Sequence, residues 1–124
     1  MTDDSSEALM QLAVAYGKAW NDADQAAILA LHTEDSIFQL HDGSAPAVGI
    51  DAVRMALRDF FGQWPDVNFV RRSIFFGKAN WAVEWTLTAR SHGKTVSLEG
   101  VDVVTARGGR VTAKHVYYDS AKAS

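Results

Sequence analysis

Two polar side chains stand in apolar parts of the sequence and have the chemistry for proton transfer. Asp102 lies in a run of valines. A carboxylate on an apolar face costs free energy unless it is paired or used, so Asp102 is a candidate general acid or base. Tyr16 is a candidate hydrogen-bond donor to an oxygen that gains negative charge. It belongs to an apolar stripe at helical spacing made up of Leu9, Leu12, Ala13, Tyr16 and Trp20.

Composition argues against several other kinds of site. The chain has no cysteine, so disulfides and thiolate chemistry are excluded, and its four histidines lack metal-ligand spacing. We therefore expect neither a metal nor a cofactor. With 12 basic and 15 acidic residues, a net charge of −3, we expect no nucleic-acid partner. The acidic N-terminus and the absence of an 18-residue apolar run predict a cytoplasmic protein without a membrane segment.

Periodicity predicts helices followed by a long sheet. Helical spacing covers residues 6–21, 24–31 and 51–63, and a first strand covers 36–41. From residue 67 the period changes to two, and three long strands at 81–91, 94–105 and 110–118 form an antiparallel meander. The order predicts an α+β fold, with three N-terminal helices packed on a strongly curved, mainly antiparallel sheet. We expect one domain over residues 1–124, with flexible tails at 1–6 and 120–124.

Turn positions predict which strand residues face each other. A two-residue turn at His92-Gly93 pairs Leu87 with Leu98, Trp85 with Gly100, and Val83 with Asp102. One sheet face is then apolar except for Asp102. Gly100 opposite Trp85 predicts either a bend in the sheet or space for the indole ring. The change of phase between Phe69 and Ile74 predicts a bulge at Arg71-Arg72.

The last hairpin allows two registers with different chemistry. A three-residue loop pairs Asp102 with Lys114 and turns Val116 and Tyr118 inward, which favours a structural ion pair. A two-residue Gly108-Gly109 turn pairs Asp102 with His115, and this pair could act as a general base. The sequence leaves both registers open.

Motifs along most of the chain resemble the SnoaL-like branch of the nuclear transport factor 2 superfamily. They are Tyr16-x-x-x-Trp20-Asn21, Leu31-x-x-x-Asp35, Gly49-x-Asp51, Gly100-x-Asp102 and Tyr117-Tyr118-Asp119. The resemblance implies a cone-shaped α+β barrel that encloses one largely apolar pocket. Polyketide cyclases of this fold use an aspartate in the sheet as general acid or base. By analogy, the resemblance implies the same role for Asp102.

Ketosteroid isomerases of the superfamily match the chain only in part. By this resemblance Tyr16 takes the place of their oxyanion tyrosine, and Asp102 that of their protonated aspartate. Leu40 stands where their catalytic base lies and cannot take a proton. The resemblance therefore does not imply a steroid isomerase of the usual kind.

Together these features predict a cup for a small, mostly apolar molecule. We expect a cofactor-independent isomerase, cyclase or lyase in which Asp102, Tyr16 and His115 are catalytic. The alternative is a non-catalytic ligand-binding or dimerisation module of the same fold. A symmetric homodimer would use the outer sheet face around Glu84, Thr86, Glu99 and Tyr117. The residues expected to line the cup are Trp20, Phe38, Leu40, Phe60, Trp64, Trp85, Leu87, Gly100, Lys114, Val116 and Tyr118.

Overall fold

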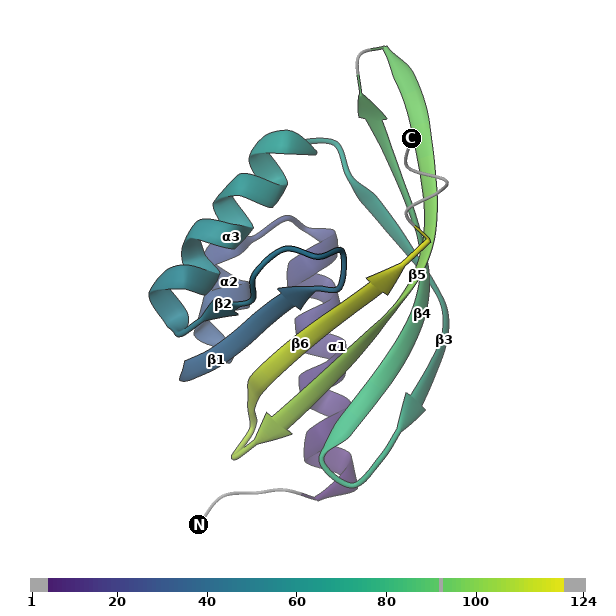
Figure 1. Ribbon diagram of the computed structural model, residues 1–124. Coiled ribbons are helices and arrows are strands. Elements are labelled where there is room, and N and C mark those ends of the chain that lie inside the picture. The colour runs from purple at the N-terminus through teal and green to yellow at the C-terminus, as the bar shows by residue number, and fades with distance from the viewer. Residues whose placement is uncertain (1–4, 92, 120–124) are drawn as a thin grey trace.

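The computed structural model, which describes residues 5–91 and 93–119, has helices on one face of a single curved sheet (Figure 1). The expected tails lie outside the described residues except for Ser5 and Ser6, where the first helix begins. None of the helices in these ranges is long and apolar enough to cross a membrane. The elements are α1 (Ser6–Asn21), α2 (Gln25–Ala30), β1 (His32–Leu40), β2 (Ala47–Val48), α3 (Ile50–Gln63), β3 (Asn68–Phe76), β4 (Asn80–Ser91), β5 (Lys94–Arg107) and β6 (Arg110–Tyr118).

Side-chain caps explain where the first two helices begin. The Ser5 hydroxyl accepts a hydrogen bond from the backbone N–H of Ala8, and Asp24 accepts one from that of Ala27. The third helix begins after Gly49, whose φ of 90° favours glycine. The predicted helices over 6–21, 24–31 and 51–63 are confirmed to within a residue at each end.

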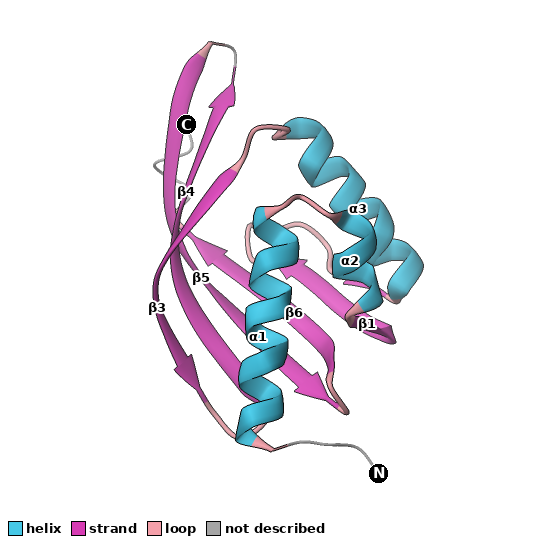
Figure 2. Cartoon of the chain, turned by 180° about the vertical axis from the view of Figure 1, so that it is seen from behind, coloured by secondary structure: helices cyan, strands magenta, loops and turns pink. Residues whose placement is uncertain are grey.

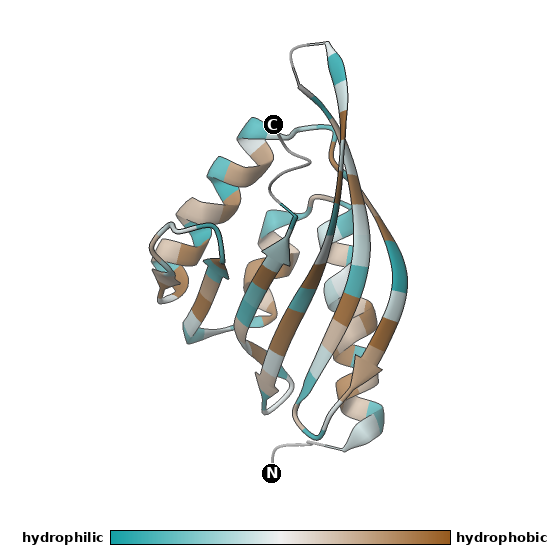
Figure 3. Ribbon diagram, turned by 45° about the vertical axis from the view of Figure 1, so that its right-hand side comes forward, coloured by the Kyte–Doolittle hydropathy of each residue, from teal (hydrophilic) through white to brown (hydrophobic). Residues whose placement is uncertain are grey.

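Six strands form the sheet in the order β2-β1-β6-β5-β4-β3. β1 runs parallel to β6, and the other neighbouring pairs are antiparallel. The sheet curves around the helices without closing on itself, and the β4–β5 hairpin extends beyond them (Figures 1 and 2). Apolar and polar residues alternate along its strands (Figure 3), which is expected of a sheet with one covered face. The predicted α+β cone is confirmed.

The register of β4 and β5 is the predicted one. Val83 lies opposite Asp102, Trp85 opposite Gly100, and Leu87 opposite Leu98. A methyl group added at Gly100 would overlap the six-membered ring of Trp85 and crowd the backbone oxygen of Tyr117. Gly100 therefore provides the space in which the Trp85 ring packs.

Neither predicted pairing of the last hairpin is exact, but the inward face and the Asp102–Lys114 ion pair expected from the three-residue loop are confirmed. The turn has two residues, since Arg107 pairs with Arg110, but a bulge between Thr105 and Ala106 shifts the pairing beyond it. Asp102 consequently lies opposite Val116, not opposite Lys114 or His115. Relative to the unbulged two-residue turn, the extra residue exchanges the two faces of β6, so that Lys114 and Val116 rather than His115 face inward.

Two further irregularities shape the sheet. The register of β3 shifts between Arg71 and Ser73, which confirms the predicted bulge. β1 begins at His32, four residues earlier than predicted, and its first pair, His32 with Val111, is followed by an irregular stretch before Ile37. The exposed acidic residues in that stretch concealed the start of the strand in the sequence. Its early start buries His32 under α1.

Candidate active site

A cavity of about 570 Å³ lies between α1 and the concave face of the sheet. This volume is typical of a pocket for a small molecule. Its floor comes from β3, β4, β5 and β6, and the charged residues Lys18, Asp22 and Arg71, all exposed, stand along its border. The remaining lining residues are Ala13, Val14, Tyr16, Gly17, Trp20, Asn21, Phe69, Ile74, Trp81, Val83, Trp85, Asp102, Val104 and Lys114.

Lys114 and Asp102 form a buried ion pair at the wall of this cavity. The Lys114 ammonium nitrogen lies 3.4 Å from Asp102 Oδ2, and the two side chains are 5% and 12% exposed. The same nitrogen lies 3.3 Å from the centroid of the Trp20 ring, where the ring's negative face stabilises the cation. Burial lowers the pKa of Lys114, and the negative charge of Asp102 opposes this shift.

Three buried polar atoms of lining residues have no hydrogen-bond partner in the described parts of the chain. They are Asp102 Oδ1, Trp20 Nε1 and Trp85 Nε1. Buried polar atoms in folded proteins are nearly always satisfied by protein, water or ligand. Asp102 Oδ1 and Trp85 Nε1 therefore remain for whatever occupies the cavity, whereas the Trp20 indole N–H interacts with the Tyr16 hydroxyl and acts to lower its pKa.

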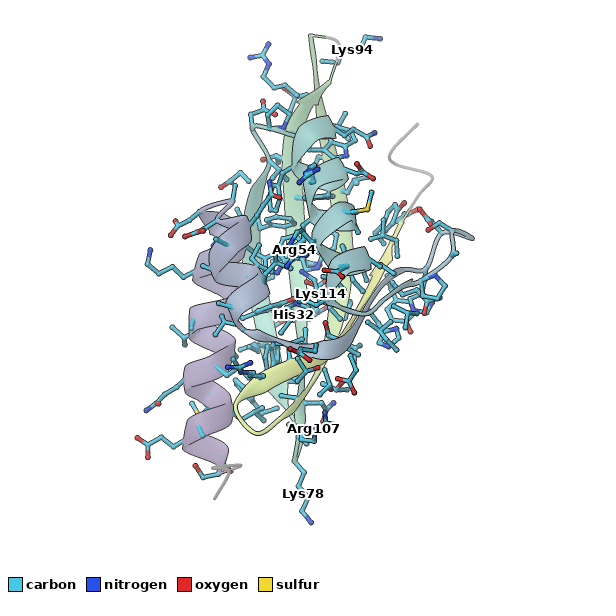
Figure 4. All side chains as sticks on the ribbon, turned by 90° about the vertical axis from the view of Figure 1, so that its left-hand side faces the viewer. His32, Arg54, Lys78, Lys94, Arg107 and Lys114 are labelled. Carbon is cyan, nitrogen blue, oxygen red and sulfur yellow. The ribbon has the colours of Figure 1, made fainter. Side chains whose placement is uncertain are left out.

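Tyr16 is held by a histidine that the sequence analysis did not select. The Tyr16 hydroxyl lies 2.8 Å from His32 Nε2, and His32 Nδ1 lies 3.0 Å from the Ser36 hydroxyl. Burial raises the pKa of Tyr16, so the phenol is neutral. Burial, together with the positive charge of Lys114, lowers the pKa of His32 to about 4, so its imidazole is also neutral at pH 7. Figure 4 shows His32 and Lys114 in the interior, whereas Lys78 and Lys94 extend from opposite ends of the molecule.

The family model of the SnoaL-like domain matches residues 13–114, which include most of α1, the strands β1 to β5, the first half of β6 and all of these polar groups. The chain belongs to the SnoaL-like family. Among proteins with curated descriptions, none matches this sequence.

Solved structures of the same fold are close in shape and distant in sequence. An NTF2-like protein of unknown function from Burkholderia pseudomallei has a TM-score of 0.85 at 19% identity, and 94% of each chain is covered. TerC, co-crystallised with polyporic acid, has a TM-score of 0.82 at 18% identity, with 92% of this chain and 93% of TerC covered. The epoxide hydrolase/cyclase-like enzyme SalBIII, of pyran ring formation in the polyether salinomycin, has 0.84 at 17%, with 97% of each covered. At these identities the likeness shows the fold.

Five of the residues expected to form the SnoaL-like cup line the cavity. They are Tyr16, Trp20, Trp85, Asp102 and Lys114. The other expected lining residues, apart from Gly100 under the Trp85 ring, pack in or against the core beside the cavity instead: Phe38, Leu40, Phe60, Trp64, Leu87, Val116 and Tyr118. Phe38 and Phe60 each meet the Trp20 ring edge to face, so they fix the ring on which Lys114 rests.

His115 is not in the cavity, and the predicted Asp102–His115 pair is wrong. The bulge in the last hairpin places His115 on the outer sheet face, where its Nδ1 lies 2.9 Å from His41 Nε2. The ring of Tyr117 stacks on His41 at a centroid distance of 4.1 Å. His115 therefore has no contact through which it could assist Asp102.

Several lining residues escaped the sequence analysis. Phe69 and Ile74 come from β3, and Trp81, Val83 and Val104 come from the meander. The phase change across Arg71-Arg72 held the signal for β3, because a bulge there brings Phe69 and Ile74 to the same face. Within the described residues, no three His, Asp or Glu side chains are grouped so that they could hold a metal ion.

Proposed function

We propose that this SnoaL-like protein binds a small, mostly apolar molecule in the cavity and moves a proton on it without a cofactor, as an isomerase, cyclase or lyase. The observation that supports this most is Asp102 Oδ1, a buried acceptor that has no hydrogen-bond partner among the described residues and lies beside a cavity of about 570 Å³. A carboxylate oxygen placed in this way suits a general base that meets its proton only on the substrate.

Asp102, Tyr16 and Lys114 would each have a separate role in this proton transfer. Asp102 would take a proton from a carbon beside a carbonyl, or from a hydroxyl, of the bound molecule. The negative charge that then develops on the substrate oxygen would be stabilised by the Tyr16 hydroxyl and by the Lys114 ammonium group. Lys114 also balances the charge of Asp102 before the reaction begins.

Aromatic walls favour a flat substrate. The rings of Trp20, Phe69, Trp81 and Trp85 line the cavity and offer faces and edges for stacking. The bound polyporic acid of TerC and the ring formation attributed to SalBIII support a cyclic or cyclising substrate here too.

Hydrogen–deuterium exchange tests the proton transfer without knowledge of the natural substrate. We would incubate a panel of apolar ketones, with 1-tetralone as the first, in D₂O and follow loss of the α-proton signal by NMR. The protein should accelerate exchange, and Asp102→Asn should abolish the acceleration because an amide cannot accept the proton. Asp59→Asn, on the exposed side of α3, is the matched control.

A non-catalytic binding module is the second candidate, and the Lys114–Asp102 pair favours it, because a structural ion pair accounts for a buried carboxylate without chemistry. The same experiment separates the two candidates. Binding of the ketones without accelerated exchange supports the module and contradicts the enzyme.

We propose further that the protein forms a symmetric homodimer through the outer face of the sheet. Val70, Phe75 and Tyr117 on that face are 52%, 61% and 45% exposed. Apolar side chains of this size on one open sheet face are typical of a surface that another chain covers.

A further inference from the structure

Three buried polar side chains form a hydrogen-bonded chain that begins at the cavity wall. Tyr16, His32 and Ser36 are 3%, 4% and 0% exposed. Tyr16 lines the cavity, its hydroxyl meets His32 Nε2, and the other ring nitrogen of His32 meets the Ser36 hydroxyl. The order in space is therefore cavity, tyrosine, histidine and serine.

The protons in this chain can be arranged in two ways. In one, Ser36 donates to Nδ1, and the proton on Nε2 is donated to the Tyr16 oxygen. In the other, Tyr16 donates to Nε2, and Nδ1–H is donated to Ser36. Since the imidazole carries a single proton, as its pKa of about 4 supports, only one arrangement holds at a time.

The hydroxyl group of Ser36 favours the first of these two proton arrangements. In the described residues, its hydroxyl has no hydrogen-bond partner other than His32. In the second arrangement the Ser36 proton would be buried without an acceptor, which is costly. In the first arrangement every proton of the histidine and serine has an acceptor. The remaining proton belongs to Tyr16, which alone among the three lines the cavity.

We propose that His32, oriented by Ser36, is a positioning residue that holds Tyr16 as a hydrogen-bond donor toward the cavity. The cavity therefore selects molecules with an acceptor oxygen, such as a carbonyl, at that point. This inference rests on the proposed binding function, and it adds the polarity of the ligand group and the residue that sets it.

The histidine tautomer provides a test that needs no ligand. Nitrogen-15 NMR of the wild-type protein at pH 7 should show the proton of His32 on Nε2 and an unprotonated Nδ1. Ser36→Ala removes the donor to Nδ1 and should move part of the population to the other tautomer. A proton on Nδ1 in the wild-type protein overturns the inference.

A matched pair of probes tests the selectivity. 2-Acetylnaphthalene and 2-isopropenylnaphthalene have nearly the same shape, and only the ketone has an acceptor oxygen. The wild-type protein should bind the ketone about five- to tenfold more tightly, which is the effect of one hydrogen bond. His32→Phe and Tyr16→Phe should each reduce this preference to nearly onefold, and their combination should add little, because His32 acts through Tyr16. His41→Phe, on the outer face, should leave it unchanged.

The outcomes separate this inference from the proposed function. If neither probe binds, the binding function is contradicted, while the NMR result still decides where the proton lies. If both bind equally to the wild-type protein, or if His32→Phe keeps the preference, the role of His32 is contradicted. If His32→Phe does not fold, Ser36→Ala is used in its place. The inference is overturned if Ser36→Ala keeps both the full preference for the ketone and the wild-type tautomer of His32.

Discussion

The Lys114 ammonium group lies between two partners, 3.3 Å from the centroid of the Trp20 ring and 3.4 Å from Asp102 Oδ2. The Trp20 ring and the Asp102 carboxylate both stabilise the buried ammonium group of Lys114. Lys114 also lines the cavity, so in the proposed reaction its positive charge would stabilise a substrate oxygen that gains negative charge.

Removing one member of the ion pair should be far more costly than removing both. Lys114→Met leaves Asp102 buried without a counter-ion, and we expect a loss of about 3–5 kcal/mol in the free energy of unfolding. Lys114→Met combined with Asp102→Asn should recover much of that loss. Urea unfolding of the two single variants and the double variant measures the coupling, and additive losses would show that the pair is unimportant to the fold.

Gly100 should not tolerate a side chain. Gly100→Ala places a methyl group in the Trp85 ring and against the Tyr117 carbonyl, and we expect a loss of about 1–3 kcal/mol in stability. The control is Gly62→Ala in α3, where nothing lies within 4 Å and where alanine should stabilise the helix by about 0.5–1 kcal/mol. Thermal unfolding compares them, and a neutral Gly100→Ala would contradict the packing described here.

Stability should fall with decreasing pH through the range in which His32 is protonated only in the unfolded chain. Its pKa is about 4 in the folded protein and 6.5 in its ordinary state. The unfolded state therefore binds the additional proton between these values, and up to about 3 kcal/mol of stability is lost as the pH falls from 6.5 to 4.

The His32 contribution can be isolated by substitution. His32→Phe should flatten the dependence of unfolding free energy on pH in this window, whereas His41→Phe on the outer face should not. Chemical denaturation at several pH values measures both slopes. Equal slopes in the wild-type protein and His32→Phe would mean that His32 is not held neutral by the fold.

The outer sheet face should determine the oligomeric state. Phe75→Lys introduces a charge where the wild-type chain exposes a phenyl ring, and it should convert a dimer to a monomer in sedimentation experiments. Met55→Lys, on the exposed side of α3, is a control of the same kind. A wild-type chain that sediments as a monomer at micromolar concentration contradicts the dimer.

Local patterns in the sequence were sufficient for most of the fold. Capping residues such as Ser5 and Asp24 defined the helix starts, and the tight turn before Lys94 set the register that places Asp102 beside Val83. These features act over a few neighbouring residues, so their effects can be inferred without knowledge of the rest of the chain. His92 of that turn lies outside the described residues.

The site depended on contacts between distant segments. The sequence by itself determined an apolar sheet face that carries Asp102 and a helix that carries Tyr16. Only the tertiary structure decided that Lys114 and not His115 faces inward, because the bulge opposite Thr105 reverses the faces of β6. It alone brought His32 to Tyr16, 16 residues away, because β1 passes under α1, and sequence periodicity carries no signal for a hydrogen bond between two elements.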